Sequence, residues 1–251
     1  MTLSASIFPP LAMPAIEIDF NRLTVSRDGT LPGDGGLTTH AAALAHRLSR
    51  EPAWLTAEKR IAVAHSFGGM LLLHCLSEGM PALNLNGMVL IATTAGPMYD
   101  VVRVSVLHVG DRTLRVPFAP LLPLWNLPIV TRLAKRAFTR GRLCVESVDF
   151  RTLSKTTDFA VDAAGWRNTD WRAMRSYRSA MKGFDVRDRL RDITVPGIVL
   201  HGTRDSLFPV DVGRTLADGL PNAVYREIEG AGHALPLTHG DVVLEAVREI
   251  R

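Results

Sequence analysis

Three residues of the types that carry out nucleophilic catalysis occur in order along this chain. Ser66 comes first, Asp205 second and His233 third, and each follows an apolar stretch. A serine hydroxyl is a weak nucleophile unless a base takes its proton, and an acidic group is needed to orient that base. Together the three residue types point to acyl transfer through a serine.

Ser66 lies in the stretch "IAVAHSFGGM" (61–70), where an apolar run stops at the serine and two glycines follow. A strand that ends in small-x-Ser-x-Gly and continues into a helix forms a nucleophile elbow, a strained turn that projects the hydroxyl above a sheet. Residues two positions to either side must be small, and Ala64 and Gly68 are small. The helix would begin at the serine, so the backbone N–H of Phe67 is expected to point at a developing oxyanion.

The same pattern has competing interpretations. A serine before Gly-Gly is often only a cap or a packing site, but the acid and the histidine that follow in order favour catalysis. His65 is the immediate neighbour of Ser66, so we expect its side chain to point away and to serve packing. His201 ends a strand-like stretch and is expected to be a hydrogen-bonded structural residue. Asp100 is the alternative acid, and the motif around Asp205 favours Asp205.

Five short apolar runs are expected to form the strands of a sheet. Four are continuously apolar, as in parallel strands covered on both faces, and the last one alternates. Helical segments lie between several of them, so the order of elements predicts a doubly wound α/β fold. The five runs are 15–20, 60–66, 87–94, 197–202 and 223–230.

Three helical segments have recognisable features. The segment 38–50 is expected to begin at a threonine cap, and the helix after Ser66 is expected to end at Gly79, with Pro81 just beyond. The segment 241–250 places three apolar residues on one face: Val243, Val247 and Ile250.

One long block interrupts this alternation of strands and helices. Within it, an apolar alternation flanks Gly110-Asp111, a dipeptide that suits a two-residue hairpin turn. A proline-rich apolar run and helical stretches follow. We expect residues 1–96 and 191–251 to form one core and residues 97–190 to form a mainly helical cap inserted into it.

The sequence resembles the α/β-hydrolase superfamily through three motifs, A-H-S-F-G-G, H-G-T-R-D-x-L-F-P and G-A-G-H-A-L-P-L. The resemblance runs in order from about residue 8 to the C-terminus, and the inserted block falls where that superfamily carries its cap. It implies a mostly parallel sheet, with Ser66 as nucleophile, His233 as general base and Asp205 as the group that orients the histidine. The superfamily includes esterases, lipases, thioesterases, peptidases, lyases and non-catalytic receptors.

The N-terminal region departs from the superfamily pattern. There, a hairpin and a central strand precede the strand matched to 15–20, and a His-Gly loop after the central strand supplies the second oxyanion donor. At the usual spacing this loop would precede Met1, so three strands are expected to be missing. Two explanations stay open: the start lies further upstream, or the sheet is reduced and the oxyanion hole is rebuilt. Losing one oxyanion donor typically costs ~10²–10³ in turnover.

The proline-rich run is the candidate substrate-binding segment. This run is interpreted either as the lining of a hydrophobic acyl site or as the inner face of the cap. The two interpretations overlap, because the inner face of a cap forms the roof of the substrate pocket. Trp171, Met174 and Met181 stand at roughly helical spacing, which favours cap core over ligand contacts. The candidate substrate-binding residues are Phe118, Leu121, Leu124 and Trp125.

Composition and motifs argue against several functional classes. Hydrophobic residues make up 47% and charged residues 22%, as in an ordinary folded domain. The formal charge of +4 is spread without a basic stripe, which argues against nucleic-acid binding. The spacing of histidines and cysteines predicts no metal site, and neither a phosphate loop nor a dinucleotide fingerprint indicates a cofactor.

The cysteines and the apolar segments indicate the compartment. Cys75 and Cys144 are too few and too far apart for a disulfide framework, which favours a reduced, cytoplasmic setting with Cys75 as an inert buried thiol. No secretory signal or membrane span is expected, because the start lacks a basic region and the apolar segment 116–131 is short and rich in proline. The excess of arginine over lysine suggests a GC-rich bacterial genome.

The sequence therefore predicts a serine hydrolase that cleaves a carboxylic ester or thioester through an acyl-enzyme and acts on a small hydrophobic molecule. One alternative is a non-catalytic protein of the same fold that binds a small molecule under its cap, which the missing His-Gly loop favours. A second alternative is a lyase that uses the same three residues as an acid–base set.

Overall fold

The computed structural model describes residues 36–98, 180–205 and 207–250, residues 15, 16, 18 and 129, and the backbone of residues 104–109, 112–117 and 143–145. The predicted strand 15–20 and the predicted cap 97–190 lie largely outside these residues. The expectations of a reduced N-terminal sheet and of a mainly helical cap therefore stay predictions.

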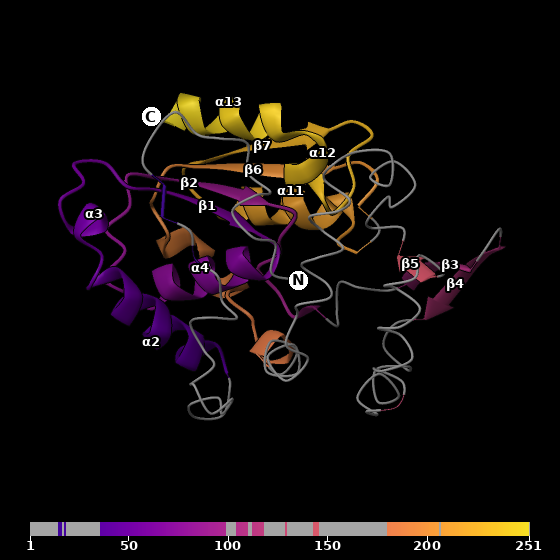
Figure 1. Ribbon diagram of the computed structural model, residues 1–251, viewed down its shortest axis with the longest axis horizontal. Coiled ribbons are helices and arrows are strands. Elements are labelled where there is room, and N and C mark those ends of the chain that lie inside the picture. Colours follow the sequence, from indigo (N-terminus) through magenta and orange to yellow (C-terminus); the bar gives the residue numbers. More distant parts are fainter. Residues whose placement is uncertain are drawn as a thin grey trace.

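Four parallel strands form the centre of the molecule (Figure 1). They are β1 (Ile61–His65), β2 (Gly87–Ile91), β6 (Gly197–Gly202) and β7 (Ala223–Ile228), in the spatial order β1-β2-β6-β7. Parallel pairing brings the carboxyl ends of all four strands to the same edge of the sheet. Four of the five predicted strands are thereby confirmed, and a doubly wound α/β fold with them.

Helices cover both faces of this sheet, which explains the continuously apolar strands. Along β2, Met88 and Leu90 enter one hydrophobic cluster, whereas Val89 and Ile91 enter the other. On the first face lie α2 (Leu37–Leu48), α4 (Phe67–Ser77), η2 (Arg187–Asp192) and α11 (Val210–Gly219), and on the second lie α12 (Leu235–Thr238) and α13 (Gly240–Ile250). The short helix α3 spans Pro52–Leu55.

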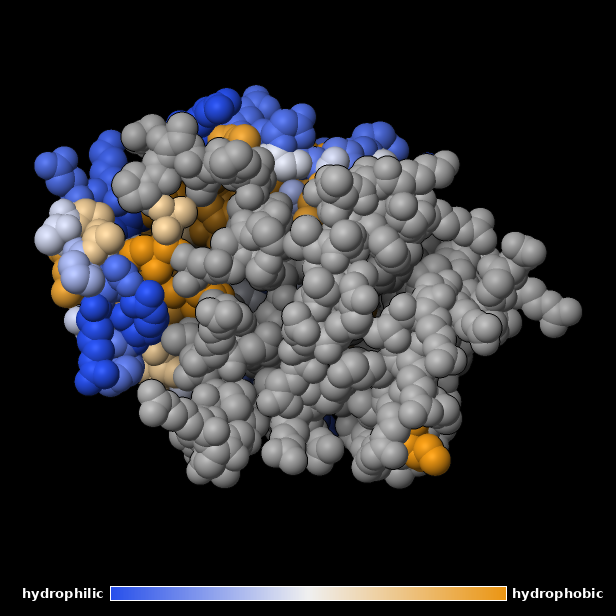
Figure 2. Space-filling model, viewed as in Figure 1, coloured by the Kyte–Doolittle hydropathy of each residue, from blue (hydrophilic) through white to orange (hydrophobic). Residues whose placement is uncertain are grey.

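Helix α13 shows the predicted apolar face. Val243 and Val247 are buried and Ile250 packs against the same cluster. The opposite side of the helix is exposed and charged, and it forms hydrophilic surface at the top of Figure 2. The helix is therefore held to the sheet by its apolar stripe rather than by helix propensity alone.

Helix α2 corrects one prediction. It begins at Leu37 with Gly36 as its N-cap, so the expected threonine cap is wrong. Its buried residues are Leu37, His40, Ala41, Leu44 and Leu48. Because these buried residues start at Leu37, burial of that side chain draws the helix start ahead of the threonines.

Helix α4 ends as predicted. Gly79 has φ of +64°, a conformation that glycine adopts without steric cost. Its N–H donates to the Leu76 carbonyl, and the Met80 N–H donates to the Cys75 carbonyl, each at 3.0 Å. This pair of bonds is a Schellman motif, which satisfies carbonyls that the helix end leaves free.

A second, three-stranded sheet is formed by residues of the inserted block. Strands β3 (Val104–Val109) and β4 (Arg112–Pro117) are antiparallel, with Val109 opposite Arg112, so the hairpin expected around residues 110–111 is confirmed. Strand β5 (Leu143–Val145) pairs with β3 on the other side, and the sequence did not predict it.

The two ends of the inserted block meet. Residues 92–196 connect β2 to β6, yet these strands are direct neighbours in the sheet. The Val186 N–H donates to the Ala95 carbonyl at 2.9 Å, which ties the returning chain to the departing one. The block thus adds no strand between β2 and β6.

Candidate active site

Ser66 occupies the predicted tight turn between β1 and α4. Its φ of +53° and ψ of −120° lie in a region that non-glycine residues avoid, so its surroundings must hold it there. The Ser66 N–H donates to the Ile91 carbonyl at 2.9 Å. The Thr93 hydroxyl donates to the Ser66 carbonyl at 2.8 Å. Ile91 is the last residue of β2 and Thr93 lies two positions beyond it, so the neighbouring strand fixes the turn.

Thr93 also explains why residue 69, the second of the two glycines after Ser66, is glycine. A Cβ atom on Gly69 would lie 2.6 Å from Oγ1 of Thr93, so only glycine allows this approach. The sequence analysis singled out Ala64 and Gly68 as the small residues and missed both Gly69 and Thr93. The sequence signal for this contact was a threonine near the end of the predicted strand 87–94.

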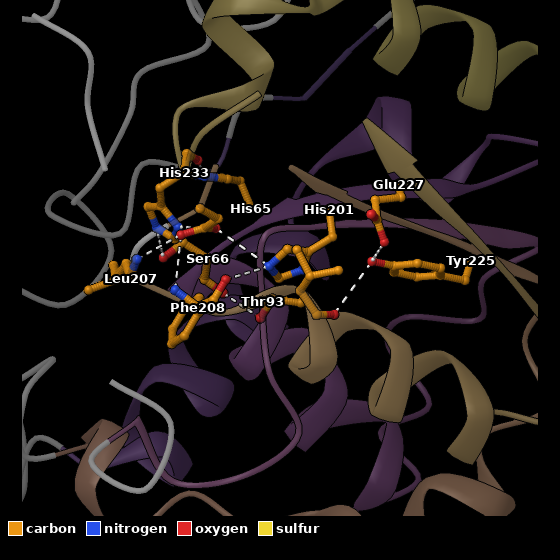
Figure 3. Close-up of polar contacts among 11 residues, drawn as sticks. His65, Ser66, Thr93, His201, Leu207, Phe208, Tyr225, Glu227 and His233 are labelled. Carbon is orange, nitrogen blue, oxygen red and sulfur yellow. Dashed lines mark hydrogen bonds and ion pairs between the residues drawn. The ribbon is translucent and has the colours of Figure 1, made fainter. Parts of the chain in front are cut away.

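The structure brings Ser66, Asp205 and His233 together at the carboxyl edge of the sheet. Figure 3 shows Ser66 beside His233. Nε2 of His233 lies 3.0 Å from Oγ of Ser66, and Nδ1 of His233 lies 2.9 Å from Oδ2 of Asp205. All three side chains are buried. A base within hydrogen-bond reach of the hydroxyl, itself held by a carboxylate, is the arrangement that nucleophilic catalysis requires.

Asp205 is held as a carboxylate by its loop. Its Oδ1 accepts hydrogen bonds from the N–H groups of Leu207 and Phe208, each at 2.9 Å. Burial alone would raise the pKa of Asp205, but the charge of His233 and the hydrogen bond from that ring outweigh burial and lower the pKa below its usual value. Asp205 is therefore ionised at neutral pH and accepts the proton on Nδ1 of His233.

His201 supports this loop, in agreement with its predicted structural role. Its Nε2 lies 2.7 Å from the Phe208 carbonyl, which can only accept, so Nε2 carries the proton. Burial lowers the pKa of His201, and the nearby Asp205 opposes this only in part. The Phe208 ring meets the His233 ring edge to face, with centroids 5.4 Å apart. His201 thus supports the acid through the Phe208 main chain.

His65 has a contact that the sequence analysis missed. Its Nε2 lies 2.7 Å from the His233 carbonyl oxygen, and the two rings are 5.0 Å apart. The expectation that this side chain serves only packing is therefore incomplete. It does not replace His233 as base, because the Ser66 hydroxyl bonds to Nε2 of His233.

Gly202 permits the loop that carries His233 to lie against β6. A Cβ atom on Gly202 would lie 2.2 Å from the Ala231 carbonyl oxygen, a main-chain atom that cannot swing aside. We expect Gly202→Ala to lower the free energy of unfolding by about 1–3 kcal/mol, the usual cost of overpacking. Urea denaturation measures this. Gly183→Ala is the matched control, because a Cβ atom there would meet nothing within 4 Å. Equal effects of the two substitutions would contradict the expectation.

The remaining predicted site residues fall into two groups. Phe67 is the first residue of α4, directly after Ser66, as expected for an oxyanion donor. Cys75 is buried, and burial raises the pKa of its thiol to about 12, which fits an inert thiol. The others lie outside the described residues: Asp100, Phe118, Leu121, Leu124, Trp125, Trp171 and Met174.

Metal sites and membrane-spanning helices are both absent from the described part of the chain. Among these residues, no three histidine, cysteine or acidic side chains are arranged to hold a metal ion. No helix in this part is both long and apolar enough to cross a membrane.

Comparison with known proteins identifies the family. A family model described as "Alpha/beta hydrolase family" matches residues 7–246, which is nearly the whole chain. The chain belongs to the alpha/beta hydrolase family.

Curated relatives of this alpha/beta hydrolase match over short segments. The pimeloyl-[acyl-carrier protein] methyl ester esterase of Chromobacterium violaceum is 37% identical over 65 residues, 26% of each chain. A putative carbamate hydrolase, RutD, of Azorhizobium caulinodans is 37% identical over 62 residues, 25% of this chain and 23% of that one. The matched segments thus span about a quarter of the length of these relatives.

Solved structures of low sequence identity show the same fold over most of the chain. A bromoperoxidase from Bacillus anthracis superposes with a TM-score of 0.64 at 18% identity and covers 91% of this chain and 79% of that one. A lipase-esterase related protein from Clostridium acetobutylicum gives a TM-score of 0.63 at 14% identity, with 89% and 78% covered. At these identities the likeness concerns the fold alone.

Proposed function

We propose that this alpha/beta hydrolase is a serine hydrolase that cleaves a carboxylic ester or thioester through an acyl-enzyme. The observation that carries the proposal is the continuous chain of contacts from Asp205 through His233 to the hydroxyl of Ser66. The esterase named among its relatives supports an ester as substrate.

The proposed mechanism follows from the tautomer of His233, which carries its proton on Nδ1. Because ionised Asp205 accepts the proton on Nδ1, Nε2 can take the proton of Ser66. Oγ of Ser66 then attacks the carbonyl carbon, and His233 returns the proton to the leaving alcohol or thiol as the bond to it breaks. A water molecule next attacks the acyl-enzyme and its proton moves to Nε2. As the acyl–Oγ bond breaks, His233 returns this proton to Oγ, which releases the acid and free Ser66.

When Oγ of Ser66 attacks, negative charge develops on the carbonyl oxygen of the substrate, and this oxygen needs hydrogen-bond donors. We propose the N–H of Phe67 as one donor, since it opens α4 beside Ser66, where the positive end of the helix dipole also favours an anion. The acyl group is proposed to lie against Phe118, Leu121, Leu124 and Trp125 of the inserted block, whose apolar character favours a hydrophobic substrate.

Treatment of the whole protein with a fluorophosphonate tests the proposal. An activated serine displaces fluoride and forms an Oγ–P bond, so intact-mass analysis should show one added phosphonyl group, located by peptide mapping at Ser66. Ser66→Ala should abolish the addition, and Ser49→Ala, at an exposed serine, should retain it. A folded wild-type protein that is not labelled would contradict the proposal and favour a non-catalytic binding protein. Turnover of a substrate without an acyl-enzyme would instead favour a lyase.

A further inference from the structure

His65 connects the two residues that the proposed reaction brings together. It is the last residue of β1 and is covalently joined to Ser66, while its side chain reaches the main chain of His233 (Figure 3). Its Nε2 lies 2.7 Å from the His233 carbonyl oxygen. A carbonyl oxygen only accepts, so His65 donates from Nε2–H, and this fixes its tautomer.

The contact falls in the loop between β7 and α12. Before His233, the loop is anchored where the Gly230 N–H donates to Oγ1 of Thr203 and the Arg204 N–H donates to the Ala231 carbonyl, each at 2.8 Å. These anchors end two residues before the histidine. Within the part of the chain that the structure describes, the bond from His65 is the one that holds the main chain of His233 itself.

We infer that His65 is a positioning residue that holds the main chain of His233 at the distance from Ser66 that proton transfer requires. The inference rests on the proposed function, because it assigns His65 a role through His233. The connection is short: one peptide bond joins His65 to Ser66, and one hydrogen bond joins it to His233. A displacement of the base by about 1 Å can lower the reaction rate by about 10²-fold, so loss of this connection is expected to slow the reaction.

The charge state of His65 suits this role. Burial, with a smaller contribution from nearby His233, lowers the pKa of His65 to about 3; the hydrogen bond to the His233 carbonyl and, to a lesser degree, Asp205 oppose this only in part. The residue keeps some accessible surface, but the nitrogen that donates is covered by the His233 carbonyl. At neutral pH His65 is therefore a neutral donor that places no positive charge beside the base.

Three substitutions separate positioning from packing. In His65→Gln, the amide nitrogen lies about as far along the side chain as Nε2 of histidine, so the donor is kept. His65→Asn carries the same amide on a side chain one carbon shorter, which does not reach the carbonyl. His65→Leu keeps apolar bulk without a donor. A packing role would rank leucine at least equal to glutamine, because an amide at a packing site gains nothing from its donor.

The second-order rate constant for fluorophosphonate labelling is the measurement, taken on proteins of matched far-ultraviolet circular dichroism. We expect the Gln variant to react within about 3-fold of the wild type, and the Asn and Leu variants to react about 10- to 100-fold more slowly. Asn and Leu variants that react as fast as the wild type would overturn the inference, and so would a Gln variant as slow as the Asn variant. Failure of the wild type to react would overturn the proposed function instead.

A measurement on the unmodified protein complements the variants. Long-range nitrogen–proton NMR spectra of the imidazole rings, assigned by the loss of signals in His65→Gln, should show His65 as the Nε2–H tautomer. An Nδ1–H tautomer would overturn the inference even if the Asn and Leu variants did not fold.

Discussion

A His233→Ala variant is expected to hydrolyse a 4-nitrophenyl ester about 10⁵- to 10⁶-fold more slowly in kcat than the wild type, with KM changed much less. Without the imidazole, no group accepts the proton of Ser66 at 3.0 Å, so the hydroxyl stays a weak nucleophile. Steady-state kinetics of release of the 4-nitrophenol measure the loss.

The matched control is His46→Ala, at an exposed position on α2, which should leave kcat unchanged. A loss of less than about 100-fold in His233→Ala would contradict the assignment of the base, because general base catalysis alone contributes about 10²–10⁴-fold. Circular dichroism of both variants excludes unfolding as the cause.

An Asp205→Asn variant is expected to lose about 10⁴-fold in kcat while the fold stays intact. The amide oxygen of asparagine can still accept from the N–H groups of Leu207 and Phe208, which keeps the loop in place. The amide nitrogen would then face Nδ1 of His233 and donate to it, so the ring proton moves to Nε2. The histidine would then present a donor where the Ser66 hydroxyl needs an acceptor.

The measurement is kcat together with the midpoint of thermal unfolding. Asp192→Asn, at an exposed position at the end of η2, is the control and should change neither quantity. If Asp205→Asn retained more than about a tenth of the activity, Asp205 would not be the acid, and Asp100 would be the next residue to replace.

The sequence predicted the strands and the order of the three candidate catalytic residues because each leaves a local pattern. Strands covered on both faces, such as β2, must be continuously apolar. The turn at Ser66 requires small neighbours, and parallel strands bring their carboxyl ends to one edge. These rules located Ser66, Asp205 and His233 without any knowledge of distances.

The contacts that support these residues were not predictable in the same way. The bonds from Thr93 to Ser66 and from His65 to His233 join segments whose proximity depends on strand register and loop path. Neither partner is marked by its neighbours in sequence. The predicted start of α2 was wrong for a related reason. Burial of Leu37 outweighs the local preference of threonine for the N-cap position.

The closed junction at Ala95 and Val186 holds the two ends of the intervening segment together beside β2 and β6. Because the two ends of the block are bonded to each other, a change in its length costs little chain entropy and moves neither β2 nor β6. The stretches next to the junction are constrained, because Ala180 and Phe184 are buried in the main hydrophobic core and Met98 packs against Phe208. Changes of length farther from the two ends are therefore expected to leave the sheet and the loop that carries His233 in place.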